Sequence, residues 1–244
     1  MIRRLTGAAA ALALTALPAL AFDPAAMTEA ERAAFRAEIR AYLLDNPEII
    51  MEAVQVLEGR QADMQAQTDR DVIAANAEII FEDGYSWVGG NPDGDITIVE
   101  FMDYRCGFCR RAVPEVDKLL AADGNIRLVI KEYPILGEQS LLMSRFAIAT
   151  KQVAGDDAYK LVHETLMGLN GDVTPEALAQ VAAELGLDGA AILARLDAPE
   201  VTRVIVETRA LAQLLNIVVR DEVLRGFLPA DQMQMVVDAK REEG

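Results

Sequence analysis

Residues 96–109 read ITIVEFMDYRCGFC, an apolar run that ends in a pair of cysteines, Cys106 and Cys109. The run 96–102 predicts a buried strand, because it is almost continuously apolar and rich in β-branched residues. Residues 110–122 then predict a helix. A strand and a sharp turn would place both cysteines at the start of a helix, where unpaired N–H groups favour a thiolate over a thiol.

This placement predicts redox chemistry. A thiolate is the attacking group in thiol–disulfide exchange, so we expect Cys106 to be the nucleophile and Cys109 to resolve the mixed disulfide. A purely structural disulfide would close a very short loop and restrict the unfolded chain little. A structural zinc site usually needs four Cys or His ligands, and the chain has two cysteines and one histidine, His163. We expect His163 to be packed or on a helix surface rather than a ligand.

The N-terminus predicts a signal peptide over residues 1–21. Two arginines precede a short apolar run, 5–17, and a small-residue cleavage site follows at 19–21. The run is too short for a comfortable membrane span, and a retained anchor is the alternative. The mature chain would begin near Phe22 with no later span, and we expect it in the periplasm, an oxidising compartment in which disulfides persist.

The chain is strongly acidic, with a formal net charge of −16. Such a surface repels nucleic acid and anionic lipid, so neither is an expected partner. The length allows one full domain with an appendage.

Residues 22–82 predict a helical N-terminal segment that mediates oligomerisation. A capping box begins at Thr28, and Asn46 and Pro47 predict the N-cap and first position of a second helix. Apolar residues recur at helical spacing on both sides of this break: Phe35, Ile39, Tyr42, Leu43, Ile50, Val54, Leu57 and Met64. Such a stripe must be buried against something. Packing on the chain's own domain is the alternative to the homo-oligomer that we favour.

Residues 83–244 predict a thioredoxin-like domain, whose start is marked by turn signals between 83 and 94. After the CxxC helix, the pattern gives a strand over 126–133, a helical insertion over about 138–213, a hairpin over 217–224 and a last helix from about 230. A βαβ crossover requires parallel strands, and the closing hairpin adds antiparallel ones. The predicted class is therefore α/β, a thioredoxin fold with an inserted helical domain and an N-terminal helical extension.

Three runs resemble a known family: VEFMDYRCGFCRRA at 99–112, KEYPILG at 131–137 and YLLDNPEII at 42–50. They are similar to the DsbA-type thiol:disulfide interchange proteins, in the suppressor-of-copper-sensitivity protein C (ScsC-like) branch. The resemblance implies a periplasmic thiol:disulfide oxidoreductase or disulfide isomerase that acts on exported client proteins. It also implies a membrane or periplasmic redox partner and an N-terminal oligomerisation segment. The CGFC pair is closer to the CGYC of isomerases than to the CPHC of strong oxidases.

The resemblance further implies roles for two charged residues. Glu100, on the strand before the CxxC, and Lys131, on the next strand, match a Glu and a Lys that form a charged pair beneath the active site. A buried carboxylate there can relay a proton, and an ordinary ion pair is the alternative. No cofactor is implied, although Cys106 and Cys109 would suit the soft cation Cu(I). A Cu(I)-binding copper-tolerance protein is therefore the alternative function.

One departure from the family concerns the loop that faces the CxxC. The family has a Gly-Thr-cis-Pro loop just before the penultimate strand, which pairs with client backbone and keeps metal from the cysteines. Here residues 214–216 lead straight into Ile217, and no proline lies between Pro199 and Pro229. We therefore expect impaired exchange with client peptides, which favours the copper alternative somewhat.

Overall fold

The computed structural model describes residues 26–212 and 217–243. The predicted signal peptide lies outside the described residues. The chain divides into two compact units, Met1–Gly59 and Arg60–Gly244. No helix in the described part of the chain is both long and apolar enough to cross a membrane.

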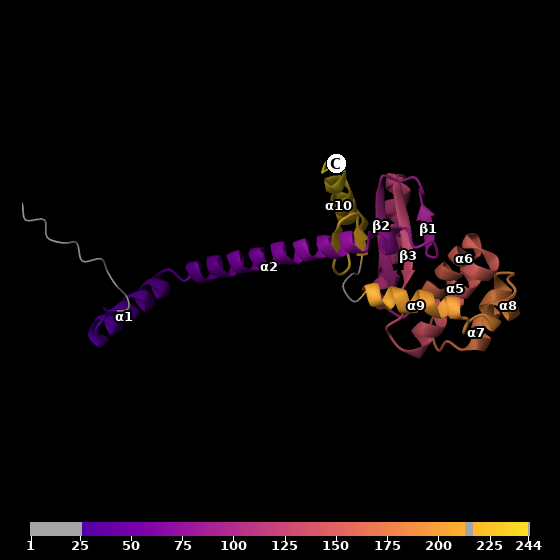
Figure 1. Cartoon of the computed structure of the whole chain (residues 1–244), viewed down its shortest axis with the longest axis horizontal. Helices are drawn as coiled ribbons and strands as arrows, with labels where there is room; N and C mark the ends of the chain where they lie inside the picture. Colours follow the sequence, from indigo (N-terminus) through magenta and orange to yellow (C-terminus); the bar gives the residue numbers. More distant parts are fainter. Residues whose placement is uncertain (1–25, 213–216, 244) are drawn as a thin grey trace, which may run out of the picture. The chain divides into compact units, whose positions relative to one another are not determined.

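Within the described residues, a five-stranded sheet forms the centre of the second unit (Figure 1). Its strands are β1 (Trp87–Gly90), β2 (Ile96–Met102), β3 (Ile126–Glu132), β4 (Ile217–Val219) and β5 (Glu222–Leu224), in the spatial order β1-β3-β2-β4-β5. β2 and β3 are parallel, and the other neighbouring strands are antiparallel. Helix α4 (Gly107–Asp123) makes the crossover between the parallel pair. This mixed sheet confirms the predicted thioredoxin fold.

The chain between β3 and β4 forms the helical insertion. It contains α5 (Glu138–Ala154), α6 (Asp156–Gly168), α7 (Pro175–Glu184), α8 (Gly189–Ala194) and α9 (Pro199–Ala212). Thr174 caps the start of α7, and Pro175 occupies its first position, where a missing N–H costs nothing. A last helix, α10 (Ala230–Glu242), follows β5.

The N-terminal helices are α1 (Glu29–Asp45), α2 (Glu48–Ala75) and α3 (Ala77–Phe81). α1 begins with the predicted capping box, in which Thr28 Oγ accepts from the Glu31 N–H and the Glu31 carboxylate accepts from the Thr28 N–H. Asn46 does not cap α2, and this prediction is wrong. Asn46 instead lies at the C-cap of α1, where its backbone N–H and its Nδ2 both donate to the Tyr42 carbonyl at 2.9 Å.

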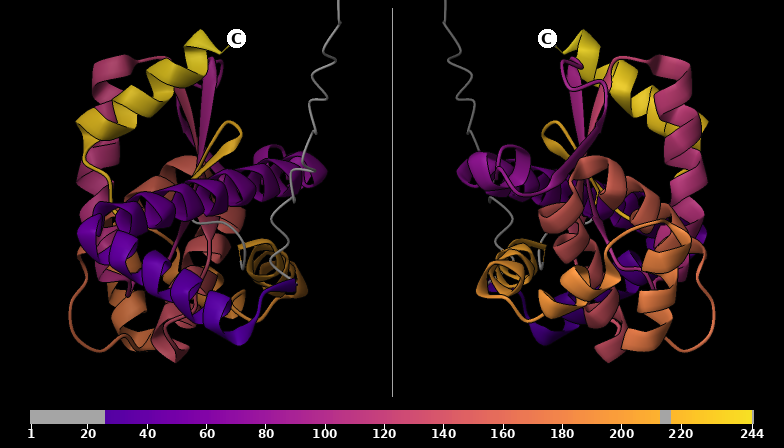
Figure 2. Two further views of the ribbon diagram at one scale, coloured as in Figure 1. Left: turned by 90° about the vertical axis from the view of Figure 1, so that its left-hand side faces the viewer. Right: turned by 90° about the vertical axis from the view of Figure 1, so that its right-hand side faces the viewer.

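Two apolar cores cover the two faces of the sheet, because successive side chains of a strand point to opposite faces. One face carries Ile98 and Met102 and packs against α4, α10 and the helical insertion. Figure 2 shows α10 beside α4, and the two helices are in contact. The other face carries Val99, which packs with Ile73 of α2 and Ile80 of α3.

The packing of Ile73 and Ile80 changes the predicted domain boundary. Both side chains are buried, at 3% and 0% exposed. The residue pattern places the boundary between 82 and 83, whereas the compact unit begins at Arg60. The end of α2 and all of α3 are therefore part of the thioredoxin-like unit.

Strand β1 was not expected, because its residues fall among the turn signals. It is short and contains Gly89 and Gly90, and glycine is depleted in strands. The Trp87 ring explains one of these glycines, since a Cβ added at Gly89 would lie 1.9 Å from Trp87 Cη2. Antiparallel pairing with β3 along the whole strand stabilises β1.

Candidate active site

Cys106 lies at the N-cap of α4, and Cys109 lies in the first turn of the same helix. Both side chains are free thiols and partly exposed. The Cys106 N–H donates to the Asp103 carbonyl at 3.0 Å, and the Arg110 N–H donates to the Cys106 carbonyl at 3.0 Å. The structure therefore places the pair at the start of a helix, as the sequence predicts.

The two thiols are not equivalent. Burial raises the pKa of Cys109 to about 12, and the neighbouring Cys106 and Glu100 add to the increase. Cys109 therefore holds its proton near neutral pH, which makes it a poor attacking group until a base removes that proton. This asymmetry favours Cys106 as the thiol that attacks first.

Asp103 fixes the turn between β2 and the CxxC. Its carboxylate accepts hydrogen bonds from the N–H groups of Arg105 (2.7 Å), Ile135 (2.7 Å) and Leu136 (3.0 Å). The Ser140 hydroxyl also donates to it, at 2.8 Å. Asp103 is 3% exposed, and a buried carboxylate is stable only with such partners. It thereby joins the CxxC turn to the loop after β3 and to α5.

Two arginines connect the same turn to the helical insertion. Arg110 Nε donates to the Tyr104 carbonyl and its Nη2 donates to the Leu169 carbonyl, both at 2.6 Å. Arg105 Nη1 donates to the Gly171 carbonyl at 2.8 Å. Hydrogen bonds from charged groups are stronger than neutral ones, so the loop after α6 helps to hold the CxxC in place.

A cavity of about 250 Å³ adjoins the two cysteines. Four large apolar residues of its lining are exposed: Phe108, Ile135, Leu136 and Phe227. Phe108 is 63% exposed, and the Arg111 guanidinium lies 4.5 Å from its ring centroid. Contiguous exposed apolar surface of this kind is typical of binding sites.

Glu100 lines this cavity and is 4% exposed. Burial raises its pKa to about 7, and the charge of Asp117 contributes. Lys131 is also buried, but it does not contact Glu100. Its Nζ donates to the Ile79 carbonyl at 2.7 Å and forms an ion pair with Asp83. The Glu100–Lys131 pair that the resemblance implied is therefore wrong for this chain.

The strand register explains the difference. Glu100 lies opposite Ile130, whereas Lys131 lies opposite Phe101. A shift of one residue moves a side chain to the other face of a sheet. Lys131 consequently lies on the face opposite to that of Glu100, and it does not line the cavity. Burial lowers the pKa of Lys131, and its hydrogen bond to Asp83 opposes that effect.

A buried polar network lies behind the CxxC turn and was not anticipated from the sequence. Glu132 accepts hydrogen bonds from the hydroxyls of Tyr104 (2.8 Å) and Tyr159 (2.7 Å). Burial raises the pKa of Glu132 to about 7. His163 is buried, with Nδ1 3.2 Å from the Tyr104 hydroxyl, and its pKa is lowered to about 4 by burial. Of the two placements predicted for His163, packed or on a helix surface, the structure shows the packed one.

Metal ligands are sparse around the cysteines. Among residues 26–212 and 217–243, no group of three or more Cys, His, Asp or Glu side chains could hold a metal ion. The loop in which the family pattern places its cis-proline falls on residues 213–216, outside the described residues. The described part of the chain contains no cis peptide bond.

A five-stranded mixed sheet with a CxxC pair opening the crossover helix defines the class, a thioredoxin-fold thiol–disulfide protein. The chain belongs to the family described as "DSBA-like thioredoxin domain", whose model matches residues 97–218, half of the chain. A second model, "Copper resistance protein ScsC N-terminal domain", matches residues 31–63. These matches support a thiol–disulfide oxidoreductase.

Solved structures agree with this assignment. A thioredoxin-like oxidoreductase from Silicibacter pomeroyi DSS-3 is 42% identical, with a TM-score of 0.63, over 68% of this chain and 97% of that one. Salmonella enterica Typhimurium BcfH is 22% identical, with a TM-score of 0.69, over 86% and 95%. Proteus mirabilis ScsC in a transitional conformation is 22% identical, with a TM-score of 0.63, over 91% and 100%. The last two likenesses show the fold alone.

Two curated relatives are much longer proteins. The Na(+)/H(+) antiporter NhaA 1 of Salinispora arenicola is 31% identical over 102 residues, which are 41% of this chain. NhaA 3 of Salinispora tropica is 28% identical over 101 residues. The chain spans about 15% of the length of either antiporter.

Proposed function

We propose that this chain is a periplasmic thiol:disulfide oxidoreductase or disulfide isomerase that acts on exported client proteins through Cys106 and Cys109. The observation that carries the proposal is the asymmetry of the two thiols at the start of α4. Cys109 holds its proton because burial raises its pKa to about 12, and Cys106 lies at the N-cap position of α4 beside an apolar-rimmed cavity.

Exchange proceeds in two displacement steps. The Cys106 thiolate attacks one sulfur of a client disulfide, forms a mixed disulfide and expels the other client sulfur as a thiolate, which takes up a proton. Cys109 then loses its proton and attacks Cys106 Sγ. This second step releases the reduced client thiol and leaves Cys106 and Cys109 joined. The reverse sequence oxidises a client dithiol, and a membrane or periplasmic redox partner resets the pair in either direction.

Glu100 is the proposed base for Cys109. A group that takes a proton works best when its pKa lies near the working pH, and burial brings the pKa of Glu100 to about 7. Glu100 and Cys109 line the same cavity. Lys131 has no proposed part in proton transfer, because it pairs with Asp83.

Client binding is proposed to use the apolar rim of the cavity. Phe108, Ile135, Leu136 and Phe227 offer contact surface to an unfolded client without sequence preference. A proline-containing loop before β4 would add backbone pairing, and the chain has no proline between Pro199 and Pro229. We therefore expect weaker exchange with peptides than with a small thiol, which needs only an accessible Cys106.

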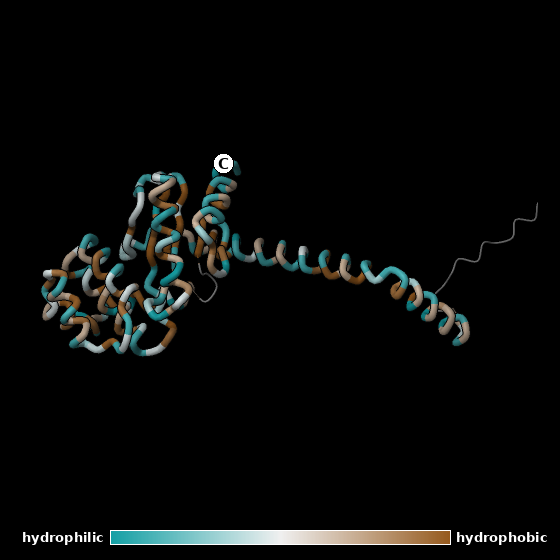
Figure 3. Tube along the Cα trace, turned by 180° about the vertical axis from the view of Figure 1, so that it is seen from behind, coloured by the Kyte–Doolittle hydropathy of each residue, from teal (hydrophilic) through white to brown (hydrophobic). Residues whose placement is uncertain are grey.

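Self-association through α1 and α2 is proposed for the first unit. Apolar residues recur along both helices, as Figure 3 illustrates. Ile50, Val54 and Leu57 are 52%, 39% and 55% exposed in the single chain. A homo-oligomer would bury this stripe and hold several CxxC sites around one client, which raises their effective concentration.

The test is an exchange assay on the mature protein and on Cys106→Ser and Cys109→Ser variants. Reduction of insulin and reactivation of scrambled ribonuclease should both require Cys106. Reactivation of ribonuclease would support isomerase activity. Insulin reduction without reactivation would support a thiol:disulfide oxidoreductase that lacks isomerase activity. No Cys106-dependent turnover in either assay would contradict the proposal.

Cu(I) binding is the second candidate function. Two thiols at one helix start suit a soft cation, and the segment before β4 has no proline to screen them. Titration with a competing Cu(I) chelator should give tighter binding to the reduced protein than to a variant with Gly-Thr-Pro inserted ahead of Val218. Equal Cu(I) affinity in the two proteins would argue against this second function, and the oxidoreductase function would remain the single candidate.

A further inference from the structure

The last turns of α2 contact the segment that follows β5. Asp69 accepts two hydrogen bonds from the Arg225 guanidinium, at 2.6 Å to Oδ2 and 2.8 Å to Oδ1. Gln65, one turn earlier, donates to the same carboxylate at 2.9 Å. The Asp69 side chain is 8% exposed. A guanidinium that bonds both carboxylate oxygens is fixed in direction as well as in distance.

Arg225 begins the segment 225–229, which connects β5 to α10. The next two residues, Gly226 and Phe227, line the CxxC cavity together with Cys106. Gly226 has a φ of 91°, a conformation that glycine adopts without strain. The chain therefore turns sharply between the residue that bonds α2 and the residue that borders the redox site.

Leu228 packs against the apolar core, whereas the start of the segment is held by polar contacts. In the described part of the chain, the bonds from Arg225 to Asp69 are the only side-chain hydrogen bonds that residues 225–229 make. Beyond the segment, the Ala230 N–H donates to Glu115 at 3.0 Å. The segment is consequently fixed near its start by α2 and at its end by α4.

We propose that Asp69 and Arg225 are positioning residues for the redox site. They hold Gly226 and Phe227 as one wall of the cavity, so that client binding at the CxxC depends on the last turns of α2. This inference rests on the proposed function for its effect on clients. The placement of the wall itself can be measured without any exchange activity.

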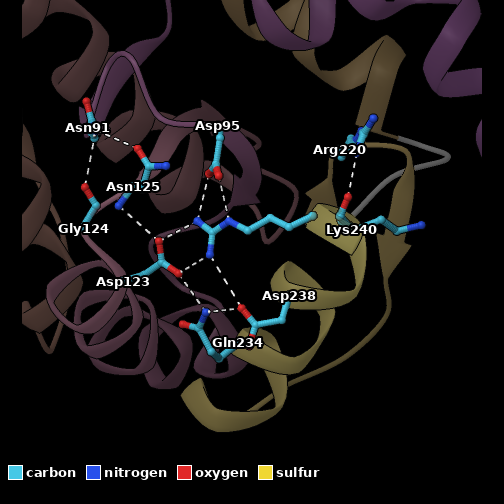
Figure 4. Close-up of polar contacts among 10 residues, drawn as sticks. Asn91, Asp95, Asp123, Gly124, Asn125, Arg220, Gln234, Asp238 and Lys240 are labelled. Carbon is cyan, nitrogen blue, oxygen red and sulfur yellow. Dashed lines mark hydrogen bonds and ion pairs between the residues drawn. The ribbon is translucent and has the colours of Figure 1, made fainter. Parts of the chain in front are cut away.

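The chain offers a matched control at the far end of α4. Asp123 is the last residue of that helix, and its side chain is 4% exposed. It accepts from Arg241 Nη1 and Nη2, both at 2.7 Å, and Asp95 holds the same guanidinium (Figure 4). A helix of 17 residues is about 25 Å long. Asp123→Asn thus removes a similar ion pair without touching the cavity.

The first measurement is the NMR order parameter of the backbone amides of residues 225–228 in wild type and three variants. In Asp69→Asn these order parameters should fall from about 0.85 to about 0.6 or less, because the segment loses the contact that fixes its start. Arg225→Lys keeps the charge and loses the planar guanidinium, so it should give a smaller decrease and serves if Asp69→Asn does not fold. Asp123→Asn should leave these amides unchanged.

The second measurement is steady-state exchange with a disulfide peptide. Asp69→Asn should raise KM about three- to tenfold at nearly constant kcat, the signature of lost binding that is equal in ground and transition states. Its equilibrium with glutathione should match wild type. Unchanged order parameters at 225–228, or equal effects of Asp69→Asn and Asp123→Asn, would overturn the inference. A wild type without Cys106-dependent exchange would refute the proposed function instead, and the order parameters would still decide whether Asp69 and Arg225 hold the cavity wall.

Discussion

Glu100 and Lys131 lie one register position apart on neighbouring parallel strands, so their side chains lie on opposite faces of the sheet. Lys131 pairs with Asp83. Within the described residues Glu100 has no ion-pair partner, and the charge of Asp117 adds to the effect of burial in raising its pKa. The site is therefore built around a buried carboxyl that titrates near pH 7, rather than around a neutralised ion pair.

The role of Glu100 predicts a pH dependence for the resolving step. The rate at which Cys109 releases a bound client should rise as pH increases through about 7, because Glu100 then loses its proton and becomes a base. Glu100→Gln should remove that inflection and slow the step about tenfold or more. Rapid-quench analysis of the mixed disulfide measures both effects.

Glu132→Gln is the matched control for this experiment. Its carboxyl also has a pKa raised to about 7 by burial, but Glu132 does not line the CxxC cavity. The control should retain the inflection near pH 7. Loss of the inflection in Glu132→Gln but not in Glu100→Gln would contradict the role of Glu100 and would indicate Glu132 as the base.

The same two carboxyls predict how stability varies with pH. Their pKa is about 7 in the folded chain against 4.5 as the ordinary value, so the folded state binds more protons between these limits. The free energy of unfolding should therefore fall as pH rises from about 4.5 to about 7, by at most about 3 kcal/mol per group. His163, whose pKa is lowered to about 4, acts in the opposite direction below about 6.5.

Urea unfolding of wild type and Glu132→Gln across this range isolates one contribution. At pH 8 the variant should be more stable than wild type, because the buried Glu132 carboxyl is charged there. At pH 4, where Glu132 is protonated, the difference in stability between the two proteins should be smaller. A difference between the two proteins that does not change with pH would contradict the raised pKa of Glu132.

Asp103 predicts a coupled loss of stability and rate. In Asp103→Asn an N–H₂ group replaces one acceptor oxygen and faces donors from Ile135, Leu136 or Ser140. We expect about 2–3 kcal/mol lower stability, the cost of leaving buried groups unpaired, and slower alkylation kinetics at a displaced Cys106. Asp172→Asn is the control and should change neither quantity, because Asp172 accepts one exposed bond from Gln139 and the asparagine keeps an oxygen that can accept it.

Assembly is tested by truncation at the boundary that the structure defines. A chain starting at Arg60 should fold and be monomeric, because it keeps Ile73 and Ile80 in the core. A chain starting at Asp83 loses both and should unfold at a lower temperature or fail to fold. Light scattering should give more subunits for the mature chain than for the Arg60 version. Two monomers would place the stripe within its own subunit, and the same oligomer in both would place the interface elsewhere.

Point variants test the same interface in the mature chain. Val54→Lys combined with Leu57→Lys places charge on the apolar stripe and should dissociate the oligomer. Gln55→Lys adds charge to a neighbouring exposed position and should not. If the double variant still forms the oligomer, the interface lies outside the apolar stripe.

Much of the fold is predictable because local signals agree with one another. The apolar run of β2, the capping box at Thr28 and the cysteines at the start of α4 each follow from residues near in sequence. Strand β1 was missed because its four residues include two glycines and pair only with a distant strand. Local composition carries no information about that partner.

The site is less predictable than the fold because its contacts join distant segments. Asp103 receives donors from residues more than thirty positions later, and the Lys131–Asp83 pair depends on strand register. One available signal was an aspartate directly after a buried strand and ahead of the CxxC. Such a carboxylate needs buried donors, but the sequence does not say which segments supply them.

The central claim is that Cys106 attacks and Cys109 resolves, and trapping tests it most directly. Cys109→Ser and Cys106→Ser variants are each mixed with a disulfide peptide, quenched with acid and weighed by mass spectrometry. Cys109→Ser should accumulate a mixed disulfide with half of the peptide at Cys106, and Cys106→Ser should give little, because burial keeps Cys109 protonated. Equal trapping by both variants, or trapping only at Cys109, would contradict the account.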